Sequence, residues 1–305
     1  MTLALAIDLG GTKIEGALVD ADGAIIEGSR HRTPTGAGAA TDLTVLERGL
    51  TEVIDGCRAH PRWNEVVAAG IGAAGPIDIT AGTIAPINLP AAHGFAIVAA
   101  VRTASGLDAV TLRLDGTCIA LAEAWRGAAR GVRNAIVFVV STGVGGGIVS
   151  DGRLVAGGSG NAGHLGQILV ADIDGEPAAS TLEQRASGPH TVAWARAQGW
   201  AGTTGEELAV SYRAGEDVAI AAVARSAHAV GVGLTSAATL LDLELAVVGG
   251  GFSFVADDYP DRIERVVRDS AVNAYAGRLK VVRAGLGGDA PLIGAGALVH
   301  RADLL

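Results

Sequence analysis

The stretch AIDLGGTKIEGALVD at residues 6–20 decides the fold of this chain. An apolar run ends at Asp8, two glycines and a threonine follow, and a second apolar run begins at once. Asp22-Gly23 then predicts a further tight turn. The pattern predicts three strands in two consecutive hairpins, at Leu3–Ile7, Ile14–Val19 and Ala24–Glu27.

A second segment repeats this order of features. Ala135–Val140 is a predicted strand, Ser141–Gly147 a glycine turn, Gly147–Val149 a strand, and Asp151-Gly152 a hairpin turn. Two copies of one supersecondary pattern predict a duplicated fold with a cleft between its halves. The remaining elements alternate between strand and helix, which is typical of an α/β fold with a mixed sheet. They are predicted at Asp42–Arg58, Val66–Gly72, Ala109–Leu114, Leu245–Val248 and Leu292–Val299.

Composition excludes several classes of function. The chain has 305 residues, a net charge of −9 and no basic run, which argues against a nucleic-acid partner. The apolar stretch 218–241 is interrupted by Arg225 and His228 and favours a core helix over a membrane span. Two cysteines indicate a reducing compartment, and the opening residues read as a buried strand without a basic leader. We therefore expect a cytoplasmic protein with no membrane partner.

The glycine turn after Asp8 has two readings. Gly10, Gly11 and Thr12 could present backbone N–H groups and a hydroxyl to a phosphate, with Asp8 near a magnesium ion. An ordinary hairpin with a glycine turn explains the same residues. Neither the Walker pattern nor the dinucleotide fingerprint GxGxxG occurs at this turn after the first strand. Two further glycine turns, at 141–143 and 249–250, favour phosphate binding.

At this point the sequence resembles the ROK family of bacterial sugar kinases and repressors, within the actin-like ATPase superfamily. The likeness covers nearly the whole chain in the family's order. The similar segments are AIDLGGTKIEGALVD (6–20), GIGAAGP (70–76), ALAEAWRGAARG (120–131), VSTGVGGGIVSDGRLV (140–155), LEQRASG (182–188), VVGGG (247–251) and GGDAPLIGAGALV (287–299).

The resemblance implies an α/β, two-lobed actin-like (ribonuclease H-like) fold with mixed sheets and a cleft between the lobes. The N-terminal lobe would comprise residues 1–112, completed by a helix at 290–305, and the C-terminal lobe residues 113–289. ATP and Mg²⁺ are the implied cofactors, with Asp8 as a magnesium ligand. The implied phosphate and ATP contacts are Asp8, Gly10, Gly11, Thr12, Lys13, Thr142 and Gly143, with Gly249 and Gly250 against the adenosine.

The resemblance also places Asp115 at the position of the catalytic base. A sugar hydroxyl is a poor nucleophile, and an aligned carboxylate can accept its proton. From the residues alone, Asp115 reads as a helix N-cap before ALAEAW. The asparagine that usually precedes this base is replaced by Leu114, which cannot hydrogen-bond a sugar.

The remaining sugar contacts implied by the resemblance are partly altered. Gly75, Asn88 and Glu183 match it, although Asn88 also reads as a turn residue before proline. His164 stands where the family has glutamate and Gln167 where it has histidine, and His164 could be a packed core residue. The family's cysteine-rich zinc loop falls at Asp174–Glu183, which contains no cysteine, so we expect no zinc site.

Three functions remain open from the sequence. The first is an ATP-dependent kinase of a hexose or N-acetylhexosamine, of glucose or N-acetylmannosamine type. The second is a sugar-binding ROK protein with weak or no kinase activity, and the third is a kinase for an atypical sugar. Family analogy implies a homodimer with a small-molecule sugar as its partner.

Overall fold

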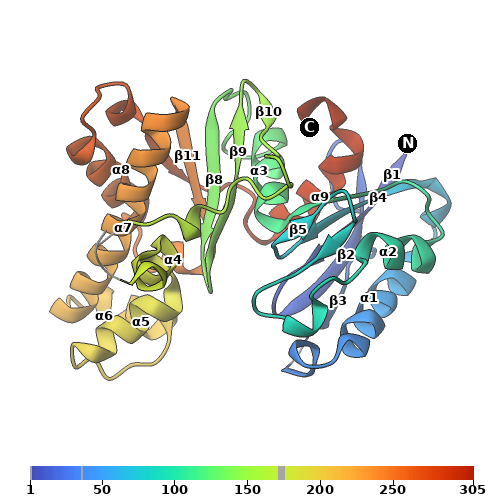
Figure 1. Ribbon diagram of the computed structural model, residues 1–305, viewed down its shortest axis with the longest axis horizontal. Coiled ribbons are helices and arrows are strands. Elements are labelled where there is room, and N and C mark those ends of the chain that lie inside the picture. The colour runs from blue at the N-terminus through green and yellow to red at the C-terminus, as the bar shows by residue number, and fades with distance from the viewer. Residues whose placement is uncertain (1, 36, 171–175) are drawn as a thin grey trace. The chain divides into compact units, whose positions relative to one another are not determined.

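The structure is a computed structural model that describes residues 2–35, 37–170 and 176–305. It divides into two compact units, each with its own sheet and core (Figure 1). The first unit comprises residues 1–130, 153–162 and 288–305, and the second comprises 131–152 and 163–287. The sequence-based lobe boundary after residue 112 stays a prediction. The compact units differ from it in keeping Asp115–Trp125 with the first sheet.

The first unit contains a mixed sheet with the strand order β3-β2-β1-β4-β7. Strand β1 runs antiparallel to β2 and parallel to β4, which is parallel to β7. A small second sheet pairs β5 with β6. The strands are β1 (Leu3–Leu9), β2 (Lys13–Asp20), β3 (His31–Pro34), β4 (Val66–Ala73), β5 (Ile77–Asp78), β6 (Thr83–Ile84) and β7 (Val110–Leu114).

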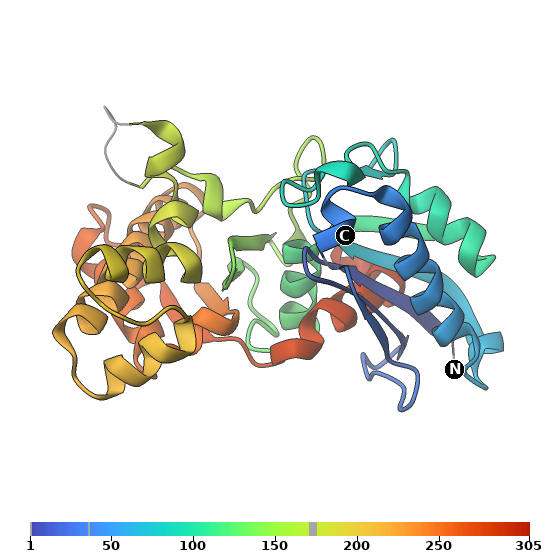
Figure 2. The ribbon, with the colours of Figure 1, turned by 90° about the horizontal axis from the view of Figure 1, so that it is seen from below.

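Helices cover both faces of this sheet (Figures 1 and 2). Large side chains at the odd positions of β1 join a core with α1 (Leu43–Arg58) and α2 (Ile97–Ser105). The opposite face carries small residues, and α3 (Asp115–Trp125) and α9 (Ala290–His300) pack against it. A Cβ added to Gly70 would lie 1.9 Å from the Ala295 carbonyl oxygen, so only glycine permits this helix to lie so close.

The second unit repeats this topology. Strands β8 (Ala135–Val140) and β9 (Val144–Ser150) form an antiparallel hairpin, and β8, β11 (Leu245–Gly249) and β12 (Lys280–Arg283) are parallel. With the short β10 (Arg153–Leu154), the order β10-β9-β8-β11-β12 matches that of the first sheet. The predicted duplication is confirmed at the level of strand order.

Helices gather on one face of the second sheet in Figure 1 and enclose the second core. They are α4 (Leu182–Ala186), α5 (Gly188–Ala197), α6 (Gly205–Arg213), α7 (Asp217–Leu241) and α8 (Tyr259–Ser270). By length and hydropathy α7 could cross a membrane, but 56% of its apolar window is buried inside the fold. Its packing against α4, α5, α6 and α8 agrees with the predicted core helix.

Two strand predictions were wrong in their limits. Residues 24–27 form only an isolated bridge at Ile25, because the buried Ser29 hydroxyl accepts the Leu18 N–H that a neighbouring strand would otherwise bond. The third strand forms later, at His31–Pro34. Glycines 145–147, expected in a turn, lie within β9. There Gly146 leaves room for β8, since an added Cβ would lie 2.3 Å from the Val137 carbonyl oxygen.

Candidate active site

The first glycine turn joins β1 to β2. The Gly10 N–H donates to the Lys13 carbonyl at 3.0 Å and closes the turn. The turn is held from outside by Thr35, whose N–H donates to the Thr12 carbonyl and whose hydroxyl donates to that of Gly11. These contacts fix the backbone of the predicted phosphate element, with Thr12 exposed at its tip.

Asp8 lies at the carboxyl end of β1, beside this turn, and is 6% exposed. Its pKa is raised to about 7, mainly by burial and then by the negative charge of Asp115, while Lys13 acts in the opposite direction. A carboxylate that is held close to another and out of water binds a cation or a proton readily. A cation bound beside Asp8 would therefore stabilise its charged form.

Asp115 is the first residue of α3 and follows directly after β7. Leu114, not Asp115, holds the N-cap position, although an Asp115 carboxylate oxygen accepts the Gly116 N–H at 2.6 Å. Gly72 pairs with Asp8 across the sheet, and a Cβ added to Gly72 would lie 3.6 Å from the Asp115 Cα. The two carboxylates therefore belong to the same end of the sheet, with a glycine between them.

Leu114 is 3% exposed and belongs to the hydrophobic core of the first unit. Its side chain is thus accounted for by the core, and it offers a sugar no hydrogen bond.

The other acceptor-side residues of the first unit are Gly75 and Asn88. Gly75 follows β4 and precedes Pro76 in a cis peptide. Asn88 is exposed and lies against the phosphate turn, since a Cβ added to Gly11 would fall 1.8 Å from the Asn88 amide nitrogen. The structure therefore brings a predicted sugar residue and a predicted phosphate residue into contact.

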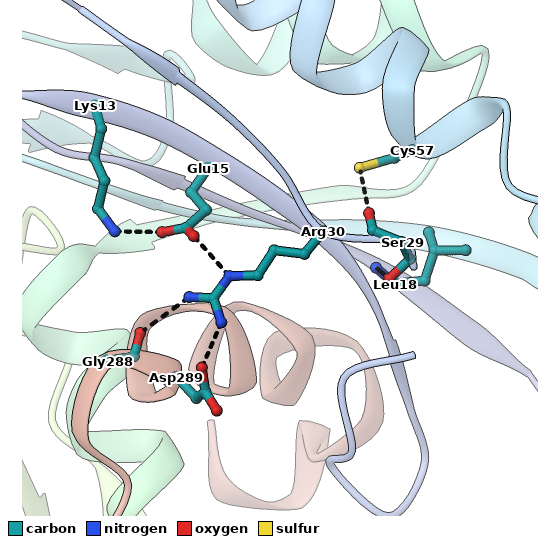
Figure 3. Close-up of polar contacts among 8 residues, drawn as sticks. All are labelled: Lys13, Glu15, Leu18, Ser29, Arg30, Cys57, Gly288 and Asp289. Atoms are coloured by element: carbon teal, nitrogen blue, oxygen red, sulfur yellow. Dashed lines mark hydrogen bonds and ion pairs between the residues drawn. The ribbon is translucent and has the colours of Figure 1, made fainter. Parts of the chain in front are cut away.

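An ion-pair chain, which the sequence did not reveal, runs from the turn to α9 (Figure 3). Buried Glu15 bonds the Lys13 ammonium through one oxygen and accepts from Arg30 Nε at 2.6 Å through the other. Arg30 also donates to Asp289 at 2.5 Å and to the Gly288 carbonyl at 3.4 Å. Burial opposes the charge on Glu15, but the hydrogen bonds from Arg30 and Lys13 outweigh it and hold its pKa below the usual value.

The glycine turn of the second unit joins β8 to β9. The Ser141 N–H donates to the Gly143 carbonyl at 2.9 Å, and the Ser141 carbonyl accepts from Gly188 at the start of α5. Glu183 accepts the Val144 N–H at 2.8 Å, and a Cβ on Gly143 would lie 2.5 Å from the same oxygen. A predicted sugar residue is thus bonded to the predicted phosphate turn.

Gln167 also reaches Glu183, with 3.5 Å between its amide nitrogen and the other carboxylate oxygen. His164 precedes the short helical turn that contains Gln167 and is half-buried. It lines an apolar cavity together with Ile136 and Ile148 of the sheet. The three sugar-side residues of the second unit therefore belong to one region, with Glu183 as its most firmly held member.

A cavity of about 600 Å³ lies within the second unit and opens beside Ser141 and Thr142. Gly251 and Phe252 line it, whereas the preceding Gly249 and Gly250 do not. Gly250 has φ 85° and packs against the Val140 backbone, so it shapes the turn that leads to the cavity. Sequence reasoning missed the residues of α5 and of the start of α6, with the two threonines before it, that complete the wall, among them Gly188, Pro189, Val192, Arg196, Thr203, Thr204 and Glu206.

No cluster of three or more histidine, cysteine, aspartate or glutamate residues suited to a metal occurs in ranges 2–35, 37–170 and 176–305. The predicted zinc-loop region begins at Asp174 and Gly175, which lie outside the described residues. The absence of a zinc site therefore stays a prediction from the sequence.

Two sheets of the same strand order, each with a glycine turn between its first two strands, define an actin-like ATPase fold. The chain belongs to the ROK family, whose model matches residues 4–302. A glucokinase from Streptomyces coelicolor is 31% identical, over 99% of both chains. An N-acetylmannosamine kinase from Salmonella heidelberg is also 31% identical, again over 99% of both.

Among solved structures, a ROK family glucokinase from Streptomyces griseus, in complex with glucose and AMPPNP, superposes with a TM-score of 0.82. It is 28% identical and the match covers 98% of this chain and 100% of that one. These relatives, together with the family match, show that the chain is a sugar kinase, that is, a phosphotransferase.

Proposed function

We propose that this sugar kinase transfers the γ-phosphate of ATP to a hydroxyl of a hexose or N-acetylhexosamine, with Asp115 as the base. The observation that carries the proposal is the pair Asp8 and Asp115, placed at one end of the first sheet on either side of Gly72. The relatives named above act on glucose or N-acetylmannosamine, which makes these two sugars the first acceptors to test.

Asp115 would accept the proton of the attacking hydroxyl as the bond to phosphorus forms. Its place at the first turn of α3 suits a carboxylate, since the positive end of the helix dipole favours negative charge there. Gly75 and Asn88 in the first unit, and His164, Gln167 and Glu183 in the second, are proposed to bind the sugar.

ATP is proposed to bind through backbone N–H groups of both glycine turns. Gly11 and Thr12 would donate in the first unit, where the Gly10 N–H closes the turn on the Lys13 carbonyl, and Thr142 and Gly143 would donate in the second. The cavity of about 600 Å³ beside Thr142 is large enough for an adenosine and is walled by Phe252. Gly249 and Gly250 are proposed to shape its floor rather than to contact the base directly.

Magnesium fits the residues present. Asp8 is a hard oxygen donor whose pKa is raised by burial and by Asp115, so a divalent cation would relieve an existing electrostatic cost. Asp8 would hold the ion, and the ion supplies charge stabilisation on the phosphates when bound. Lys13 is paired with Glu15, so we assign it to orienting the turn as well as to attracting phosphate.

A panel of sugars, each assayed for sugar-dependent ADP release with Mg-ATP, tests the proposal. We expect turnover with glucose, N-acetylmannosamine or a close relative, well above ATP hydrolysis without sugar. The loss of a polar group at Leu114 favours one further outcome, a preference for an acceptor that lacks or alters the corresponding hydroxyl. Sugar binding without ADP release, for every member of the panel, would contradict the proposal and favour a sensor.

The proposal also includes a cytoplasmic location and a homodimer, both by analogy with the family. Light scattering of the purified chain checks the second: twice the chain mass of 30.4 kDa is expected, and a monomer at all concentrations would contradict it.

A further inference from the structure

A second polar cavity lies in the first unit, away from the glycine turn. It has a volume of about 260 Å³ and follows the outer edge of β7. The turn between β5 and β6 and the side of α2 form its other walls. Its lining residues include Thr80, Gly82, Arg102, Thr111 and Arg113.

Two arginines line this cavity, and no aspartate or glutamate of the described chain does. Arg102 Nε donates to the Asp108 carbonyl at 3.0 Å, and Arg113 Nη1 donates to the Leu112 carbonyl at 2.8 Å. Each bond uses a single donor of a guanidinium that has five. One oxygen of the Asp78 carboxylate accepts the Thr80 and Ala81 N–H groups of the β5–β6 turn, and Asp78 is not among the residues that line the cavity.

Arg113 carries the further sign of a missing partner. Within the described part of the chain its Nε is buried and has no hydrogen-bond acceptor. A buried donor left unpaired is destabilising, and more so when it belongs to a charged group. The Nε itself is closed off from the cavity, but an anion beside the guanidinium would offset part of this cost through its charge.

We propose that this cavity binds an oxyanion of the phosphate class, free or as the phosphoryl group of a small ester. Arginine forks match tetrahedral oxyanions in geometry and charge. Thr80 in the β5–β6 turn and Thr111 in β7 add hydroxyl-bearing side chains to the lining. The volume holds one phosphate with its remaining water, and is too small for a nucleotide.

The cavity is linked to the candidate active site by the chain itself. Arg113 lies near the end of β7, two residues before Asp115, and its register partner in β4 is Gly72. Anion binding would fix the end of β7, from which α3 and Asp115 begin. The proposal does not depend on kinase activity, because it concerns binding alone.

Arginine Nε–H resonances of the full chain, followed by NMR during titration with sodium phosphate, test the proposal. Arg113→Lys identifies the Arg113 signal, and sodium chloride at equal ionic strength serves as the blank. We expect the Arg113 signal to shift saturably with phosphate and not with chloride. Arg102→Ala, on the exposed face of α2, should weaken the apparent affinity at least tenfold.

Arg48→Ala is the matched control, since Arg48 is an exposed arginine of the same unit outside the cavity, and it should bind phosphate as the wild type does. Titration with glucose 6-phosphate in place of phosphate distinguishes a site for free phosphate from a site for a phosphate ester. Equal affinity assigns the site to the phosphoryl group alone, and tighter binding assigns it to an ester. An Arg113 signal that does not move, or an Arg102→Ala chain that binds as tightly as the wild type, overturns the proposal.

Discussion

At the scale of single residues, the charge of Asp8 is the most consequential feature. Its pKa of about 7 in the folded chain compares with 3.8 for a free side chain, and burial is the main cause. The folded state therefore binds a proton more tightly than the unfolded state does. Between about pH 4 and pH 7, stability owed to this group falls as pH rises, because the folded chain must give up a proton that it holds well.

Asp8→Asn should accordingly stabilise the metal-free protein at pH 8 and have little effect near pH 4. The shift of about three pKa units sets an upper bound of about 4 kcal/mol for the gain. Urea unfolding at both pH values checks this. Asp55→Asn, on the exposed face of α1, is the control and should show no such trend. A gain that is equal at both pH values would show that Asp8 titrates normally.

The contact between Gly11 and Asn88 predicts that substitutions at the two residues have non-additive effects on sugar binding. Gly11→Ala places a methyl group on the Asn88 amide, and the exposed Asn88 side chain can rotate away. Stability should change by less than about 1 kcal/mol. The KM for the sugar should rise roughly tenfold, as it should for Asn88→Ala. In the Asn88→Ala background, Gly11→Ala should add little, and a full second increase would mean that the two residues act independently.

At the scale of elements, the ion-pair chain Lys13–Glu15–Arg30–Asp289 joins the first hairpin to the start of α9. Its members differ sharply in burial: the Glu15 side chain is 4% exposed and that of Asp289 is 53% exposed. Buried members of such a chain leave an uncompensated charge when removed, whereas exposed members are screened by water.

Glu15→Gln should therefore cost about 3 kcal/mol at pH 7, and Asp289→Asn less than about 1 kcal/mol. Because the Glu15 pKa is lowered in the folded chain, its stabilisation is present above the usual carboxyl pKa of 4.5 and is lost as pH falls below it. The two variants should converge toward the wild type in acid. Urea unfolding at pH 7 measures both losses of stability. Equal losses for the two variants would contradict the burial argument.

The packing of α9 predicts a severe effect at Gly70. An added methyl group would overlap the Ala295 backbone, which cannot rotate away as a side chain can. Gly70→Ala should destabilise the chain by about 3 kcal/mol or more. Gly158→Ala is the control, since nothing lies within 4 Å of its Cβ position. Comparable melting temperatures for the two variants would show that α9 is free to shift.

The elements that could be predicted from the sequence are those whose structure is determined by neighbouring residues in the chain. The hairpin at Asp8, the helix at Leu43–Arg58 and the strand at Leu245–Gly249 follow from apolar periodicity and glycine turns. The failure at residues 24–27 has a specific cause, since a serine hydroxyl takes over a strand hydrogen bond. Periodicity carries no information about such a replacement.

The candidate site divides in the same way. Positions such as Asp115, Asn88 and Glu183 came from family motifs, and their assignments stay proposals. The pairing of Glu15 with Arg30 and then Asp289 joins residues up to 259 positions apart, and the Glu183 contact to the Val144 N–H crosses 39 positions. Contacts at such separations are set by the folded topology, which a single sequence does not display.

At the scale of the whole molecule, the repeated strand order assigns comparable parts to the two units. Each has a glycine turn between its first two strands, and each turn is held by a group from elsewhere in its own unit: Thr35 in the first and Glu183 in the second. The first unit adds the two carboxylates and the second adds the large cavity. We infer that duplication supplied the scaffold and that the two copies then took different chemical tasks.

The central claim is that Asp115 is the base of a sugar kinase, and Asp115→Asn tests it most directly. The asparagine keeps the size of the side chain and can still accept the Gly116 N–H, but cannot take a proton. Single-turnover transfer from [γ-³²P]ATP to the best sugar of the panel is measured beside AMPPNP affinity. We predict transfer slowed by at least about 10³-fold with AMPPNP affinity unchanged within about threefold. Transfer at the wild-type rate would contradict the account.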